Sequence, residues 1–171
     1  MIRARRLMLL LALTLPAPPI AAQSLEALRS APLEISADEA EITRNGDMRY
    51  SGNVVFTSAT LEARGDTLQL SRDGEGQVRV RISGDPAELE HRPEGKDMQP
   101  VDASAQSIDF DRATGVVQLR GAVAVQRAGD RISGEELRYE IVEQRITASG
   151  GDSGGRVRIT IDPETLEGFE Q

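Results

Sequence analysis

The feature that most constrains this chain is a short phrase repeated within a regular alternation of apolar and polar residues. The phrase is a small residue, an acidic or amide residue, any residue and then an apolar residue, at positions 37–40, 65–68, 105–108 and 134–137. A second phrase, apolar-x-Gly-x-Val, falls between the copies at 50–54 and 119–123. The order and spacing predict a β-unit of about 65 residues that occurs twice, and such a repeat is typical of stacked strands.

From Pro32 onward, apolar residues recur at every second position, as in Val78, Val80 and Ile82. This alternation predicts antiparallel strands with one buried face and one solvated face. Turn residues separate the alternating runs at short intervals, and no segment after residue 31 has a helical pattern. We therefore predict an all-β fold of about sixteen short antiparallel strands, built from two similar halves.

Four glycines of the repeat fall inside the alternating pattern: Gly52, Gly65, Gly121 and Gly134. A glycine within a strand normally weakens it. Small residues at fixed intervals instead indicate corners, where each strand bends from one sheet into the facing sheet. The predicted architecture is an open, V-shaped pair of sheets with the apolar residues between them.

The two ends of the chain have different compositions from the middle. Arginines 3, 5 and 6, the apolar run 7–15 and Ala21-Ala22 before Gln23 form the pattern of a cleavable secretory signal peptide. The apolar run is shorter than the roughly 20 residues that span a bilayer. The expected organisation is a signal peptide at 1–22, a short helical turn or loose leader at 23–31, one β-domain at 32–162 and an acidic tail at 163–171. The polar stretch 91–100 is expected to join the two halves.

Charge and cysteine content exclude several function classes. The chain has 20 basic and 28 acidic residues, a formal net charge of −8, and loss of the three signal arginines makes this −11. Such an acidic protein is a poor ligand for nucleic acids or anionic membranes, which require clustered Lys and Arg. The chain has no cysteine, so the fold is held without disulfides and no thiol nucleophile exists.

The sequence also offers little for catalysis. The one histidine, His91, begins the polar stretch, and a lone histidine is more often solvated or structural than catalytic. Nucleophile-elbow and phosphate-loop motifs are absent from the sequence. Asp109 and Asp111 flank Phe110 on the opposite strand face, where they either hold a cation or, as we favour, form part of a solvated face. We expect no enzymatic activity, no cofactor and no metal site.

The apolar inner face has two interpretations. It can be an ordinary closed sandwich core, or it can line a groove for a long apolar ligand. The chain has only three Phe, two Tyr and no Trp, so few large side chains are available to fill the space between two sheets. The first strand, within 32–37, and the last, within 156–161, have no closing partner, and open edges invite strand addition by another chain. These features favour the groove.

Several segments resemble the LptA/OstA family: 32–38 (PLEISAD), 50–55 (YSGNVV), 119–123 (LRGAV) and 134–137 (GEEL). The resemblance extends over about residues 32–162. It implies an open V-shaped β-jellyroll, the OstA-like domain, whose interior shields the lipid A acyl chains of lipopolysaccharide in the periplasm. It also implies head-to-tail self-association through the strand edges, as a bridge from an LptC-like inner-membrane protein to an LptD-like outer-membrane protein.

On this hypothesis two sets of residues carry the function. The lipid-binding groove is lined by Leu33, Ile35, Val54, Phe56, Leu68, Ile82, Leu89, Ile108, Phe110, Val117, Leu119, Val123 and Val125. The edge-strand contacts with partners are made by Leu33, Ile35, Val157, Ile159 and Ile161. The alternative hypothesis is a structural or scaffolding module without lipid, which has a closed core and recruits partners through its open edges.

Overall fold

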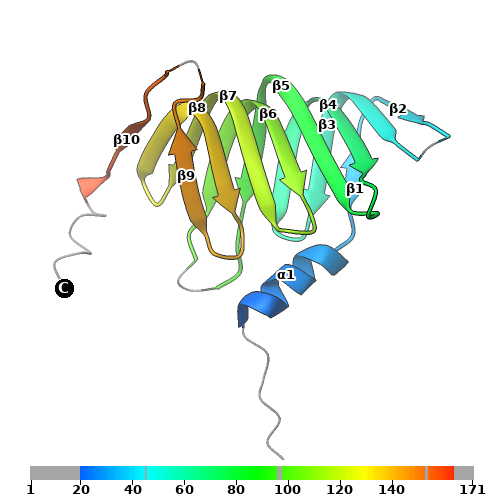
Figure 1. Ribbon diagram of the computed structural model, residues 1–171, viewed down its shortest axis with the longest axis horizontal. Coiled ribbons are helices and arrows are strands. Elements are labelled where there is room, and N and C mark those ends of the chain that lie inside the picture. Colours follow the sequence, from blue (N-terminus) through cyan, green and yellow to red (C-terminus); the bar gives the residue numbers. More distant parts are fainter. Residues whose placement is uncertain (1–19, 45, 96–97, 153, 164–171) are drawn as a thin grey trace, which may run out of the picture.

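One antiparallel sheet forms the body of the protein in the computed structural model (Figure 1). The structure describes residues 20–44, 46–95, 98–152 and 154–163, which contain one helix and ten strands. They are α1 (Ile20–Ser30), β1 (Glu34–Ser36), β2 (Glu39–Ile42), β3 (Met48–Ser58), β4 (Leu61–Arg72), β5 (Val78–His91), β6 (Val101–Asp111), β7 (Val116–Arg127), β8 (Asp130–Glu140), β9 (Arg145–Ser149) and β10 (Arg158–Thr160). The strand order is β1-β3-β4-β5-β6-β7-β8-β10, with β2 also paired to β3 and β9 to β8.

Each central strand, β3 to β8, bends where its pairing shifts in register, for example after Ser51 in β3 and after Arg120 in β7. The bends fold the sheet onto itself, and we call the two facing halves wall A and wall B. Wall A comprises residues 34–36, 54–58, 61–64, 87–91, 101–104, 123–127, 130–134 and 158–160. Wall B comprises residues 39–42, 48–51, 67–72, 78–83, 107–111, 116–120, 136–140 and 145–149.

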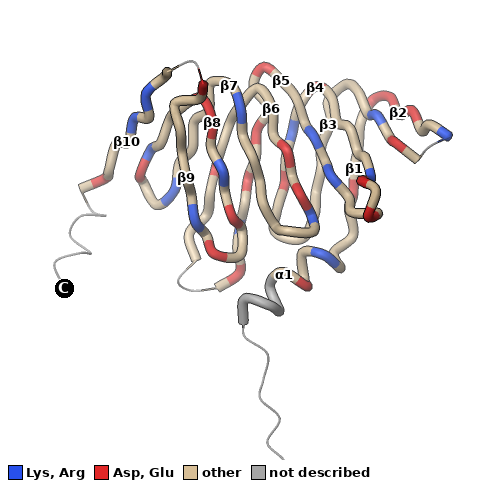
Figure 2. The backbone as a smooth tube through the Cα atoms, viewed as in Figure 1, with Lys and Arg blue, Asp and Glu red and all other residues tan. Residues whose placement is uncertain are grey.

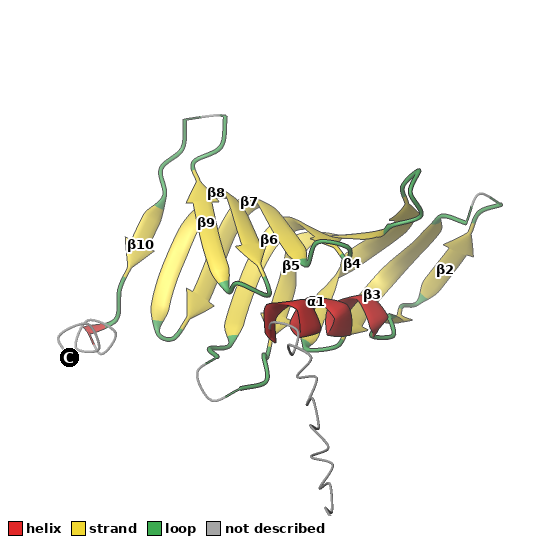
Figure 3. Ribbon diagram, turned by 60° about the horizontal axis from the view of Figure 1, so that its bottom comes forward, coloured by secondary structure: helices red, strands yellow, loops and turns green. Residues whose placement is uncertain are grey.

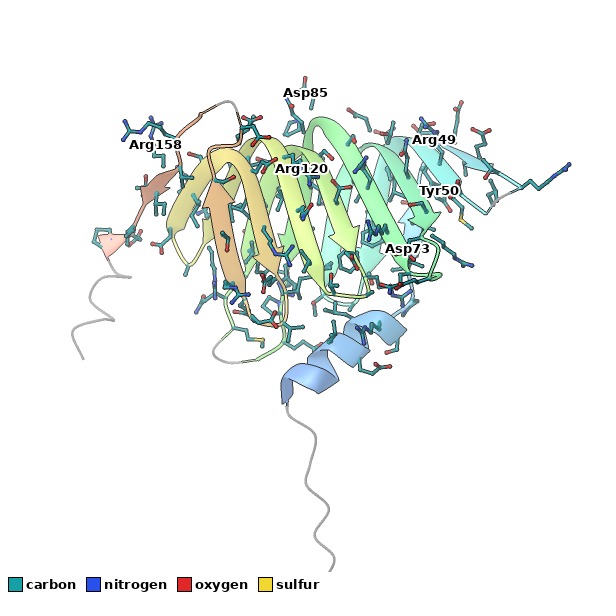
Figure 4. All side chains as sticks on the ribbon, viewed as in Figure 1. Arg49, Tyr50, Asp73, Asp85, Arg120 and Arg158 are labelled. Carbon is teal, nitrogen blue, oxygen red and sulfur yellow. The ribbon has the colours of Figure 1, made fainter. Side chains whose placement is uncertain are left out.

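The line of bends is one border of the folded sheet, here called the ridge, and the hairpin turns form the opposite border, here called the rim. Asp85 marks the ridge and Asp73 lies towards the rim in Figure 4. The predicted all-β, V-shaped fold is confirmed, and the four predicted corners at Gly52, Gly65, Gly121 and Gly134 lie at register shifts. The sixteen predicted short strands correspond to the strand segments of the two walls. The described residues form only ten strands because six of them continue through the bend.

The two halves share their backbone conformation, with a period of 69 residues, close to the period expected from the sequence. Gly52 and Asn53 have φ of 77° and 47°, and Gly121 and Ala122, 69 positions further on, have φ of 80° and 48°. A left-handed pair of residues at a register shift is a β-bulge geometry, which turns a strand sharply. The recurring phrase in the sequence therefore encodes the bend of the sheet at two equivalent places.

The core lies between the walls. Phe56 of wall A and Phe110 of wall B are in contact, with ring centroids 6.2 Å apart. The burial pattern alternates along β6 and β7, so every second side chain enters the interior. Because successive side chains of a strand point to opposite faces, the alternation in the sequence becomes one apolar and one polar face of the sheet.

Helix α1 lies where the sequence indicated either a short helical turn or a loose leader. It covers most of residues 23–31, and its buried residue Leu28 belongs to the same apolar cluster as the strands. The helix begins at Ile20, so the predicted signal-peptide boundary after Ala22 falls inside α1. Residues 1–19 and 164–171, which carry the rest of the predicted signal peptide and most of the predicted tail, lie outside the described residues. No helix within the described residues is long and apolar enough to span a membrane.

Candidate functional site

The predicted groove residues converge in one apolar cluster between the walls. Eleven of the thirteen are between 0 and 4% exposed, and Leu33 and Ile35 are half-buried against the same cluster. They come from both walls, as Phe56 and Phe110 show. The structure therefore brings the predicted residues together, and side chains of the two walls are in contact with each other. Their role as a lipid-binding lining stays a prediction.

Further residues belong to this interior that were not among the predicted lining residues. The cluster also contains Leu28, Leu61, Ala63, Leu70, Val80, Ala87, Val101, Ala103, Ala105, Leu137, Tyr139 and Ile141. Most of them stand at inward positions of the same alternating strands, so the period-two pattern was the signal that could have found them. Leu28 has no such signal, because it lies on a helix outside the predicted β-domain.

His91 joins the two walls near the rim. Its side chain is 2% exposed, with Nδ1 2.7 Å from the Tyr139 hydroxyl of wall B and Nε2 3.0 Å from the Thr60 hydroxyl. Both hydrogen bonds are available to a neutral imidazole, because a hydroxyl can donate or accept. Burial lowers the pKa of His91 from 6.5 to about 4, and the charge of Arg92 contributes to the same shift. His91 is therefore a buried structural residue at the end of β5, and the loop expected from residue 91 begins after it.

Tyr139 and Arg127 complete this connection between the walls. Burial raises the pKa of Tyr139 to about 12, against the opposing effect of the Arg127 charge, so its hydroxyl keeps its proton. Arg127, at the end of β7 in wall A, donates to the backbone oxygen of Gln144 at 2.7 Å and to its Oε1 at 3.0 Å. Gln144 lies in the turn between β8 and β9 on the wall B side, so the pair spans the rim.

The rim also contains the only two buried polar side-chain atoms within the described residues that have no hydrogen-bond partner, Ser58 Oγ and Gln144 Nε2. Ser58 ends β3 on wall A, and Gln144 lies in the turn between β8 and β9 on the wall B side. A buried polar group without a partner costs about 1–3 kcal/mol. Within the described residues, the buried polar atoms that lack a hydrogen-bond partner therefore lie at the closed rim.

Helix α1 lies across this rim, beyond the ends of the strands (Figures 1 and 3). Arg29 Nε donates to the Ala113 oxygen at 2.8 Å, in the turn between β6 and β7. From that same turn, Arg112 donates to the oxygens of Leu28, at 3.3 Å, and Ala31. A cationic side chain at carbonyls near a helix C-terminus is favourable because these carbonyls have no partner within the helix.

A cavity of about 240 Å³ lies beside α1 at the rim. Rim residues of both walls line it together with the helix: Ala27 and Leu28 of α1, Thr60 and His91 on the wall A side, and Val142 on the wall B side. The cavity therefore adjoins the interior at the place where the walls meet α1.

The predicted edge residues lie at the two ends of the strand order. β1 and β10 each have one strand neighbour among the described residues, β3 and β8 respectively. Val157, Ile159 and Ile161 are 37%, 58% and 48% exposed, whereas Leu33 and Ile35 are half-buried. The apolar C-terminal edge is thus accessible to another chain. That these residues contact partners stays a prediction.

The outer face of wall B is covered with ion pairs, and basic and acidic positions interleave along its strands (Figure 2). Asp109 accepts from Arg81 Nε at 2.6 Å and from Arg120 Nη1 at 2.9 Å. Asp111 accepts from the backbone N–H of Ala113 and so caps the turn between β6 and β7. Hydrogen bonds from Arg138 and then Arg145 lower the pKa of Glu140. The two aspartates therefore form part of a charged outer face, which agrees with the favoured interpretation of this pair.

A sheet folded at a ridge, with a continuous apolar interior and accessible edge strands, defines the class of open β-jellyrolls. Residues 34–145 match the family described as "LptA/(LptD N-terminal domain) LPS transport protein", and the chain belongs to this family, as its sequence motifs suggested.

Individual relatives agree with this assignment. The chain is 28% identical over 163 residues to the lipopolysaccharide export system protein LptA of Escherichia coli K12, covering 93% of this chain and 86% of that protein. It is 29% identical over 131 residues to LptH of Pseudomonas aeruginosa, covering 75% and 74%. The crystal structure of LptH, titled the LptA homologous periplasmic component of the lipopolysaccharide transport device, matches with a TM-score of 0.72 at 26% identity, covering 80% of this chain and 99% of that one.

Proposed function

We propose that this protein is a periplasmic carrier of lipopolysaccharide that shields the lipid A acyl chains between its two walls. The observation that carries the proposal is the continuous apolar cluster contributed by both walls of an open sheet. The family assignment and the names of the relatives support it. The predicted signal peptide is consistent with a periplasmic location.

The physical need for such a carrier follows from the hydrophobic effect. Each acyl methylene removed from water contributes about 0.8 kcal/mol, so a lipid with several chains requires a shielded path across an aqueous compartment. An interior of similar aliphatic side chains offers no single preferred depth, and a chain can therefore move along it. The proposal involves no catalytic step. Because the walls touch in this structure, lipid binding requires them to separate.

Site-specific photo-crosslinking tests the carrier role. An aliphatic photo-reactive residue replaces either Leu119, which faces the interior, or its neighbour Arg120, which faces outward on the same strand. With purified lipopolysaccharide, the protein carrying the probe at 119 is expected to be labelled and the protein carrying it at 120 is not. Equal labelling at the two positions, or none at either, would contradict an interior lipid site. The matched pair controls for strand, depth along the sheet and probe chemistry.

We further propose that the edges join copies of this protein, and LptC-like and LptD-like proteins at the two membranes, into a bridge. The exposed apolar residues in and beside β10 support this arrangement, because an edge strand with free backbone groups can pair with a strand of another chain. The substitution Ile159→Asp is expected to abolish concentration-dependent oligomers, as measured by sedimentation. Met98→Asp, at an exposed apolar position in the loop between β5 and β6 and away from both edges, is the matched control. Oligomers unaffected by Ile159→Asp would exclude β10 as the joining edge.

The scaffolding alternative remains distinguishable from the carrier. The close contact of the walls is the observation that favours it, because a closed core needs no ligand. A scaffold would form the same oligomers through β10, yet the probe at Leu119 would label no lipid. The crosslinking and sedimentation experiments together therefore separate the two functions.

A further inference from the structure

The route into the interior is restricted by the topology of the sheet. At the ridge, the six central strands pass without interruption from wall A to wall B, so the sheet itself closes that border. An acyl chain that enters from the side must therefore pass the rim, where only turns and the loop between β5 and β6 border the interior. Helix α1 lies across this border (Figure 3).

The contacts of α1 reach the rim of both walls. Leu28 is 4% exposed and belongs to the interior cluster. A Cβ placed on Gly115, in the turn between β6 and β7, would lie 3.5 Å from Leu28 Cδ1 and 3.2 Å from Leu25 Cδ1. On the other side, Ala27 and Leu28 share the rim cavity with Thr60 and His91 of the wall A border. The helix thus occupies the space through which a chain would enter.

The attachment of α1 is weak compared with that of the strands. Leu28 is the one buried side chain among residues 25–30, and the polar anchors of the helix, Arg29 and Arg112, hold backbone oxygens in exposed or half-buried surroundings. α1 has eleven residues, of which the predicted mature chain keeps residues 23–30, and a helix of this length is marginal without tertiary contacts. Elements with few buried apolar contacts open at a small fraction of the free energy of global unfolding.

Opening the rim breaks the hydrogen bonds of His91 with Tyr139 and of Arg127 with Gln144, and two unpaired polar atoms offset part of that cost. Ser58 Oγ and Gln144 Nε2 lack partners while the rim is closed, and they gain water or a polar ligand group when it opens. The polar headgroup region that follows an acyl chain could therefore hydrogen-bond at the same border. Ser58 lies on wall A and Gln144 on the wall B side, so each atom becomes accessible where its own part of the rim opens.

We propose that α1 is an intramolecular plug of the lipid entrance, and that an acyl chain enters through the rim cavity by displacing Leu28. This inference rests on the proposed function, because it assigns the entrance and the control of the same interior. In the free protein the plug keeps the apolar interior from water. With lipid bound, α1 leaves the rim.

A crosslinking experiment tests the plug. Because the sequence has no native cysteine, only the introduced cysteines react with the linker. The double variant Arg29→Cys with Ala113→Cys, joined by a short cleavable thiol-reactive linker, fixes α1 to the turn that it contacts. The control double variant Arg64→Cys with Glu90→Cys joins two neighbouring strands on the outer face of wall A, where Arg64 Nη1 and Glu90 Oε1 are 3.2 Å apart. Binding of fluorescently labelled, purified lipopolysaccharide is measured before crosslinking, after it, and after cleavage of the linker.

The expected result is that the locked plug loses binding at least tenfold and regains it on cleavage, while the control crosslink has no effect. If both crosslinked proteins bind as well as the uncrosslinked ones, the plug is refuted and the carrier function stands. Equal loss in both would also refute the plug, because the effect would not depend on α1. If no protein binds lipopolysaccharide even before crosslinking, the proposed function itself fails.

A second variant tests the plug without a crosslink. Leu28→Ser removes the buried side chain of α1 and leaves the strands intact, which circular dichroism verifies. The rate of lipopolysaccharide association is expected to rise about tenfold, because the buried apolar contact of Leu28 no longer has to be broken before a chain enters. The exposed Glu26→Ser, two residues earlier on the same helix, is expected to leave the rate unchanged. A Leu28→Ser rate equal to the parent rate would overturn the proposal.

Discussion

Replacement of Gly121 by alanine tests the claim that the repeated phrase bends the sheet. Gly121 has φ of 80°, and a Cβ at this position would lie 2.8 Å from Cδ and 2.9 Å from Cβ of Gln106, the amide residue of the repeat on the neighbouring strand. Cβ atoms in folded proteins do not approach other heavy atoms so closely, so the Gln106 side chain must move. The substitution therefore has two separate costs, one in the backbone and one in packing.

The size of the effect follows from these two costs. A non-glycine residue in the left-handed region costs about 1–2 kcal/mol. Displacing the exposed Gln106 side chain adds about 1 kcal/mol, at the low end of the range for an overpacked contact. We expect Gly121→Ala to lower the free energy of unfolding by about 2–3 kcal/mol, and the melting temperature by roughly 4–12 °C for a chain of this size. Urea unfolding followed by circular dichroism measures the first quantity.

Two glycines of one turn separate the two costs. Gly76 has φ of 78° and open space where a Cβ would lie, with nothing within 4 Å, so Gly76→Ala reports the backbone cost alone. Gly74 has open space and no left-handed φ, so Gly74→Ala is expected to be neutral or slightly stabilising. Adding Gln106→Ala to Gly121→Ala removes the amide group and should restore part of the packing cost. If Gly121→Ala loses no more stability than Gly76→Ala, the contact with Gln106 does not matter; if it is as mild as Gly74→Ala, the argument for the bend is wrong.

Three further predictions concern the contacts between the walls. Burial holds the pKa of His91 at about 4, below 6.5 for the exposed side chain, so the unfolded chain binds more protons between these two pH values. Stability that is present above pH 6.5 is therefore lost as the pH falls towards 4, by about 3 kcal/mol at most. Urea unfolding of the parent and of His91→Gln, compared across this pH range, isolates the contribution of His91. Tyr139→Phe should cost about 1–3 kcal/mol, since it leaves Nδ1 of the buried His91 without its partner. Tyr50→Phe, whose half-buried hydroxyl donates to the sulfur of Met48, should cost less than about 0.5 kcal/mol. Similar losses of stability in the two variants would exclude a special role of the His91 contact. Arg127→Met should speed amide hydrogen exchange in the turn between β8 and β9, because Gln144 loses both hydrogen bonds across the rim, and unchanged exchange there would show that this pair does not hold the rim closed.

Much of the fold was accessible from the sequence because its contacts are local in the chain. From β3 to β8, each strand pairs with the next through a hairpin, whereas β1 with β3 and β8 with β10 pair across an intervening strand. The alternation specifies which side chains face inward, and Gly52 and Gly121 mark where the strands bend. The predicted groove residues therefore meet in one cluster, although their contact with lipid has yet to be measured.

The rim could not be predicted in the same way. His91 and Tyr139 lie on β5 and β8, which are not neighbours in the sheet, and they meet only because the two walls face each other. Arg112 reaches the carbonyl of Leu28, 84 residues away, on a helix outside the repeat. Neither residue pair has a local sequence signal, and His91 stands at the start of a polar stretch that suggested a solvated loop.

The repeat and the alternation determined by themselves that this chain forms a bent, two-walled sheet, because strand pleating and the left-handed bulge depend on short-range sterics. Only the tertiary structure decided which parts of the two walls touch, how the rim is closed and where α1 lies. These features depend on the angle of the bend and on side chains that are distant in sequence. The repeated phrase shapes the interior, whereas side-chain packing across the rim sets how the rim is closed.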